Sequence, residues 1–137
     1  MDDTMNGLDL GRYQWRNRLL LLFAPAADDP LFVVQQDELA AHRSGLAERG
    51  LLVFVLFATA DGEGDSQVVS PAQAADLRTR FGVSTNSLTV LLIGKDGTEK
   101  LRSGRVVPAA DLFGLIDSMP MRRDEMRGAG TASRDRQ

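Results

Sequence analysis

The sequence contains no cysteine among its 137 residues. A thiolate is the nucleophile of disulfide exchange and of thiol peroxidase chemistry, so the chain performs neither reaction with its own side chains. Zinc–thiolate sites and iron–sulfur clusters are excluded for the same reason. Disulfides are absent too, so cysteine usage gives no information about the compartment.

Positive charge is also in short supply, with 16 Lys and Arg against 19 Asp and Glu and a net charge of −3. Nucleic-acid binding needs clustered cations that replace phosphate counterions, so we expect no nucleic-acid partner. Apolar runs such as residues 19–24 are far shorter than a membrane span, and we expect none. The acidic start at Met1 is not typical of a signal peptide. We therefore expect a cytoplasmic protein as the chain stands, or a periplasmic or secreted one if a signal peptide has been removed.

The sequence holds one histidine, His42. A Ser-His-Asp set would have to use it, and no partner nucleophile is evident. His42 lies between Leu39 and Leu46 at helical spacing, on the same stripe as Gln35. This spacing favours a hydrogen-bonded histidine at the edge of the core over a catalytic base.

Four strands are expected from the apolar runs that the sequence does contain. Residues 19–24 and 51–57 are apolar throughout, which is typical of strands covered on both faces. A third run at 88–93 leads into the turn at Asp96-Gly97 and then into an edge strand at 99–102. The intervening residues 59–69 are acidic and Gly-rich, and predict a flexible loop.

Three helices are expected beside these strands, at 30–49, 71–81 and 108–119. The element order is then β-α-β-α-β-β-α, a single α/β domain with a mixed four-stranded sheet and helices on both faces. We expect a flexible arm over residues 1–14, a domain over 15–127 and a disordered tail over 128–137.

That order of elements resembles a minimal thioredoxin-like fold, and residues 91–97 resemble the strand and turn that follow the cis-proline of thioredoxins. A sharper resemblance is to an uncharacterised family of small bacterial proteins related to the DUDES domains of vertebrate sushi-repeat-containing extracellular proteins. It is carried by residues 15–21, 92–97 with 100–102, and 116–126. The resemblance implies a thioredoxin-like fold over about residues 13–127 and implies no activity.

Two positions depart from working thioredoxins. Residues 27–31 read Ala-Asp-Asp-Pro-Leu where the Cys-x-x-Cys would lie, and Leu88-Thr89 replaces the cis-proline. Asp28 and Asp29 in this turn are either caps of the following helix or paired carboxylates for cation binding or acid–base work.

A calcium loop at Asp61–Asp65 is not supported, because Ser66 and Ala72 occupy the positions of the required glycine and glutamate. We accordingly expect no metal and no cofactor.

Cations and methionines gather near the end of the chain. Arg102 lies on the expected edge strand, where arginine discourages unwanted pairing or contacts an acidic partner. Met121, Arg122 and Arg123 follow Pro120, a composition suited either to an adaptable contact surface or to a docked lid with solvated arginines. Asp124 or Glu125 would pair with Arg18 or Arg102 if these lie nearby.

The interpretation that we favour is a redox-inactive binding or interaction module of unknown partner. Its candidate surface comprises Asp28, Asp29, Arg102, Met121, Arg122 and Arg123. We keep two partners open, another protein and a second copy of the chain. The alternative is an enzyme on the same scaffold, peroxidase-like or hydrolytic, that uses groups other than thiols.

Overall fold

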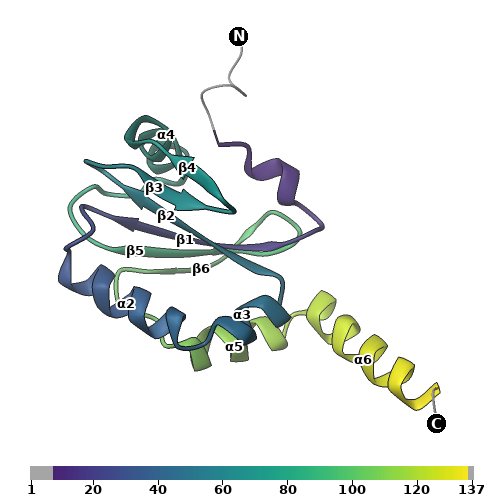
Figure 1. The fold of residues 1–137 in the computed structure, drawn as a ribbon. Coiled ribbons are helices and arrows are strands. Elements are labelled where there is room, and N and C mark those ends of the chain that lie inside the picture. The colour runs from purple at the N-terminus through teal and green to yellow at the C-terminus, as the bar shows by residue number, and fades with distance from the viewer. Residues whose placement is uncertain (1–7, 136–137) are drawn as a thin grey trace.

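A computed structural model describes residues 8–135, with side chains up to Arg127. The chain forms a six-stranded mixed sheet in the order β4-β3-β2-β1-β5-β6 (Figure 1). The strands are β1 Arg18–Ala24, β2 Leu51–Phe57, β3 Gly62–Gly64, β4 Gln67–Val69, β5 Thr89–Ile93 and β6 Glu99–Ser103. The helices are η1 Leu10–Tyr13, α2 Pro30–Ala40, α3 Arg43–Glu48, α4 Pro71–Phe81, α5 Ala109–Asp117 and α6 Pro120–Asp135.

Strand β1 lies at the centre and is buried at every residue. It pairs in parallel with β2 and antiparallel with β5, so that Leu21 lies opposite Phe54 on one side and Leu91 on the other. Alternate side chains of β1 enter two separate cores. Leu20, Leu22 and Ala24 pack with α2, α3 and α5 on one face of the sheet. Leu19, Leu21 and Phe23 pack with η1 and α4 on the other face. Helices on both faces explain why the central strands are apolar throughout.

The expected count of four strands was wrong, because the stretch taken for a flexible loop folds into the β3–β4 hairpin and extends the sheet. Asp65 and Ser66 turn the hairpin with φ values of 51° and 60°. Gly64 lies so close to the Phe54 ring that an added Cβ would overlap it. Gly64, which suggests a flexible loop in the sequence, is therefore required for close packing against Phe54.

The helix expected over residues 30–49 divides into α2 and α3 at Ala41 and His42. His42 lies at the edge of the core, where its ring makes an edge contact with Phe113, a side chain packed against the core. Its side chain is 44% exposed, and its Nδ1 lies 2.9 Å from the carbonyl oxygen of Glu38. Gln35 is buried as expected, where it donates to the Val107 carbonyl at 3.0 Å and accepts from the Val107 N–H at 2.6 Å.

The two ends of the chain bear on the expected boundaries. Leu10 and Tyr13 are buried against the sheet, while residues 1–7 lie outside the described part, so flexibility of the arm stays a prediction. Helix α6 extends past residue 127 to Asp135 and points away from the sheet (Figure 1). The expectation of a disordered tail over residues 128–137 also stays a prediction. No described helix has the length and hydropathy that a membrane span requires.

Candidate interaction site at the amino end of the central strand

The structure does not bring the sequence-predicted site residues together. Asp28 is exposed at the carboxyl end of β1, and Asp29 caps α2 by accepting from the Phe32 N–H at 3.0 Å. Met121, Arg122 and Arg123 lie in the first turn of α6, which meets the opposite end of β1.

Arg102 forms a third, separate location on β6. It pairs with Glu99 at 2.9 Å, and its Nη2 donates to the carbonyl oxygen of Phe81 at 2.6 Å. Arg102 therefore ties the end of α4 to the edge of the sheet.

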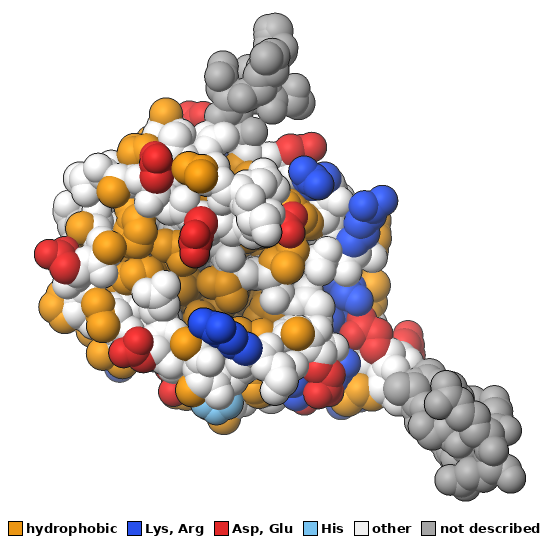
Figure 2. All heavy atoms as spheres, viewed as in Figure 1, with side chains coloured by type: hydrophobic (Ala, Val, Ile, Leu, Met, Phe, Trp, Pro, Cys, Tyr) orange, Lys and Arg blue, Asp and Glu red, His pale blue; other side chains and the backbone are white. Residues whose placement is uncertain are grey.

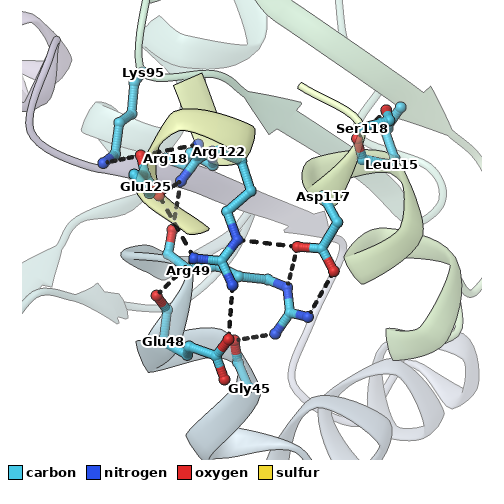
Figure 3. A network of polar contacts seen from close by, with 10 residues as sticks. All are labelled: Arg18, Gly45, Glu48, Arg49, Lys95, Leu115, Asp117, Ser118, Arg122 and Glu125. Atoms are coloured by element: carbon cyan, nitrogen blue, oxygen red, sulfur yellow. Dashed lines mark hydrogen bonds and ion pairs between the residues drawn. The ribbon is translucent and has the colours of Figure 1, made fainter. Parts of the chain in front are cut away.

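Arg122 fastens α6 to two other helices (Figure 3). Its residue is only 5% exposed. Its Nε donates to Asp117 of α5 at 3.0 Å, and its Nη2 donates to Glu48 of α3 at 2.6 Å. Arg122 therefore lies beneath the surface, while Met121 and Arg123 on either side of it are exposed.

Arg18 joins the same network from β1 and is 1% exposed. Its Nη1 and Nη2 each lie 3.3 Å from the Glu125 carboxylate, and its Nη1 also donates to the Arg49 carbonyl at 2.8 Å. Lys95 reaches Glu125 at 2.6 Å. The Glu125 carboxylate of α6 thus bridges β1 and the loop after β5. Its pairing with Arg18 is one of those considered from the sequence.

The two central carboxylates of the network are held ionised. Hydrogen bonds from Arg49 lower the pKa of Asp117, with burial opposing the shift and Arg122 adding to it. Burial acts to raise the pKa of Glu125, but hydrogen bonds from Lys95 and Arg18 outweigh it, so the pKa is lowered. Carboxylates saturated by cations in this way hold elements together and are poor proton acceptors.

A hollow of about 380 Å³ lies beside this network. Trp15 and Met121 line it with Met119 and Pro120, and Lys95 and Lys100 contribute to its wall. Trp15 is 62% exposed. Its backbone φ is 71°, and its backbone N–H donates to the Lys95 carbonyl at 2.6 Å. We name Trp15, Lys95, Lys100, Met119 and Met121 the Trp15 surface.

Sequence reasoning missed Trp15 as a site residue. It precedes a strand and follows a polar arm, so no periodicity indicates whether its ring is buried. Its left-handed backbone leaves no signal either, because turns of this kind normally carry Gly, Asn or Asp.

A second hollow, of about 540 Å³, lies between the α2–α3 segment and the β3–β4 hairpin, and Figure 2 shows apolar side chains at its base. Tyr13 donates its hydroxyl to Asp65 at 2.6 Å, and burial together with this bond raises the Tyr13 pKa, which keeps the hydroxyl protonated. Across the described residues, no group of three or more His, Asp or Glu side chains is arranged to hold a metal ion.

The fold and the site together define a small mixed α/β domain whose buried ion pairs fasten its own elements and whose exposed Trp–Met hollow remains open. The chain belongs to the family described as "Domain of unknown function (DUF4174)", whose model matches residues 9–125.

Similar stretches occur inside longer proteins. The chain is 32% identical over 120 residues to the Sushi repeat-containing protein SRPX of Homo sapiens and, to the same extent, to that of Rattus norvegicus, covering 85% of this chain and 26% of each relative. It is 29% identical over 137 residues to Coiled-coil domain-containing protein 80 of Danio rerio, covering 85% of this chain and 15% of that protein. The chain thus spans about a quarter of the length of its sushi-repeat relatives, and the expected relationship to such proteins is confirmed.

Proposed function

We propose that the chain is a redox-inactive interaction module on a thioredoxin-like scaffold, and that the Trp15 surface is where a partner binds. The partner segment is acidic and carries an apolar side chain that contacts Trp15 and Met121. Arg122 holds the first turn of α6, which carries Met121, against α3 and α5.

The arrangement of strands supports the scaffold. A parallel β1–β2 pair joined through α2 and α3 is followed by the antiparallel β5–β6 hairpin and then by α5. This is the order of elements that the resemblance to thioredoxins implies. The β3–β4 hairpin is an addition at one edge, beyond β2.

Exposed tryptophan and methionine side chains support a contact role. Trp, Met and Arg are enriched at protein interfaces, where large apolar side chains exclude water at the centre of a contact. Met121 is 37% exposed and Trp15 62% exposed. Unbranched methionine adapts to the shape of different partners.

The backbone of Trp15 is the observation that carries the proposal. A left-handed conformation costs a residue with a side chain about 1–2 kcal/mol, whereas glycine adopts it freely. Residues held in such conformations cluster at functional sites. A strained tryptophan that is also mostly exposed gives the fold little in return, and binding explains its presence.

The charges around the hollow favour an acidic partner. Its described lining includes Arg18, Lys95, Lys100 and Asp96. Glu125 pairs with Arg18 and Lys95, and Asp96 pairs with Lys100, so three cations meet two carboxylates and one positive charge is in excess, although the whole chain carries a net charge of −3. Complementary charge accelerates encounter and selects the partner more than it tightens the complex.

The experiment is selection of a displayed library of short random peptides on the purified chain. We expect enriched peptides to combine acidic residues with an aromatic or branched aliphatic residue. Met121→Gln is expected to weaken their binding by roughly tenfold, because an apolar contact worth about 1–2 kcal/mol is lost.

Met126→Gln is the matched control, since Met126 is 38% exposed on the same helix but does not line the hollow. Equal effects of the two variants, or peptides that bind Trp15→Gly as well as the native chain, would overturn the proposal. Peptides lacking acidic residues would overturn the assigned partner chemistry alone.

A further inference from the structure

A third buried arginine lies far from the Trp15 surface, at the carboxyl end of the parallel strands. Arg78 projects inward from α4 and is 4% exposed. Its Nη2 donates to the carbonyl oxygens of Ala24 at 3.0 Å and Leu56 at 3.4 Å. Ala24 is the last residue of β1 and Leu56 is the penultimate residue of β2, so the guanidinium lies across the ends of the two strands.

The charge of Arg78 is not neutralised within the described part of the chain, where its only oxygen partners are those carbonyls. Its Nε is buried without a hydrogen-bond partner. Burial alone accounts for the lowered pKa of Arg78, with no carboxylate acting against it. A buried charge is normally paired, because desolvation without a counter-ion costs several kcal/mol.

Hydroxyl groups surround the hollow that Arg78 lines. This hollow of about 520 Å³ lies between the second half of α4 and the segment that follows it. Thr79, Ser84 and Thr85 contribute hydroxyls, and Arg78 is the only charged residue among the described residues that line it. Hydroxyl donors beside one guanidinium match the oxygen-rich surface of a small anion.

The position in the sheet independently favours a ligand. The chain leaves β1 toward α2 on one face and reaches α4 on the opposite face after β2. Adjacent parallel strands whose following helices diverge in this way leave a crevice at their carboxyl ends, and ligands of open α/β sheets bind there. The hollow itself is lined by α4 and the segment after it, and Arg78 is the residue that belongs both to its lining and to the strand ends.

We propose that this hollow binds a small oxyanion, a carboxylate or phosphate group, whose charge pairs with Arg78. The hydroxyls of Thr79 and Ser84 donate to the remaining oxygens, and the Thr85 hydroxyl joins them by turning away from Asn86 Oδ1, to which it donates at 3.5 Å. A guanidinium suits this task because it stays charged and presents fixed donors to a planar or tetrahedral anion. The Arg78 site is distinct from the Trp15 surface and does not depend on the proposed interaction function.

The test measures the thermal unfolding midpoint in phosphate, sulfate, acetate and chloride at matched ionic strength. We expect phosphate or acetate to raise the midpoint saturably over chloride, because a ligand that binds only the folded state stabilises it. Which anion acts distinguishes a phosphate group from a carboxylate. Arg78→Gln is expected to abolish the shift.

Arg80→Gln is the matched control, since it removes an exposed cation from the same helix two positions away. It is expected to leave the anion response unchanged. If Arg78→Gln does not fold, Thr79→Val serves in its place, and we expect it to reduce anion affinity by roughly tenfold through one lost hydrogen bond. The site is refuted by a native chain that responds to all four anions alike, or by equal losses in the Arg78 or Thr79 variant and in Arg80→Gln.

Discussion

Arg18 and Arg78 are buried at opposite ends of the same central strand. They are 1% and 4% exposed, and each has an Nε without a partner. Arg18 lies 3.3 Å from the carboxylate of Glu125. The oxygen partners of Arg78 among the described residues are backbone carbonyls alone, and its guanidinium carbon lies 5.6 Å from the centroid of the Phe23 ring. The burial is the same, and the difference lies in the counter-charge.

The difference assigns the two ends different tasks. At the amino end, carboxylates from α3, α5 and α6 neutralise the arginines, so the network fastens α6 and leaves an apolar hollow as the feature open to a partner. At the carboxyl end, the chain supplies the cation and leaves the anion to be provided from outside. Buried arginine is therefore structural where its counter-ion is internal, and marks a binding site where it is not.

Replacing each arginine by methionine breaks this comparison most directly. Arg18→Met leaves Glu125 with fewer cations and the Arg49 carbonyl without its hydrogen-bond donor, so we expect a loss of about 3 kcal/mol in the free energy of unfolding. Arg78→Met leaves no charge behind, and a loss of about 1 kcal/mol is expected from its hydrogen bonds. Urea denaturation measures both, and equal losses would show that the counter-charge is unimportant.

Removing the shared carboxylate is expected to have the next largest effect. Glu125→Gln withdraws the counter-charge of Arg18 and Lys95, at a cost of about 2 kcal/mol after allowance for partial exposure. Asp124→Asn is the control, because among the described side chains Asp124 pairs only with Arg127, on the exposed face of the same helix. That change is expected to cost less than about 0.5 kcal/mol by the same denaturation measurement. A larger effect at Asp124 than at Glu125 would place the fastening of α6 elsewhere.

Acid is expected to loosen the amino end first. The folded-state pKa values of Asp117 and Glu125 are lowered, so their contribution is complete above the unfolded-state values near pH 4 and is lost as the pH falls through the folded values. Trp15, the only tryptophan, lines a hollow with Met121 of α6, so its fluorescence reports docking of α6. We expect the fluorescence to change below about pH 4 before far-UV circular dichroism does. Coincident changes would mean that the network is not the weakest part in acid.

The smallest expected effect concerns the strained tryptophan. Trp15→Gly relieves the left-handed backbone and loses few contacts, so a gain of about 0.5 kcal/mol in unfolding free energy is expected. Trp15→Ala keeps the strain and is expected to show no gain. A large loss of stability in the glycine variant would mean that Trp15 serves the fold.

Sequence patterns predict the parts of this molecule that depend on local chemistry. Continuous apolar runs predict β1 and β2, and Ser70 with Gln73 forms a capping box at the start of α4. The β3–β4 hairpin escapes such reasoning, because Gly64 is selected by the nearby Phe54 ring, which is distant in sequence. The turn at His42 escapes it too, since no glycine or proline marks the break between α2 and α3.

The candidate site could be predicted only in fragments. The composition of the segment after Pro120 indicates that Met121 and Arg123 are accessible. Burial of Arg122 depends on Asp117 and Glu48, which come from two other helices. Arg78 follows Leu77 on α4 and resembles any solvated helical arginine in sequence. Its burial is set by the ends of β1 and β2, which no local pattern reveals.

The arginine Nε–H resonances of the native chain, followed by nuclear magnetic resonance during separate phosphate and acetate titrations at constant ionic strength, test the contrast between the two ends most directly. We expect the Arg78 resonance to move saturably, while those of Arg18 and Arg122 stay in place because their carboxylate partners are internal. Movement of all three together, or of none, would contradict the division into a self-neutralised end and an anion-binding end.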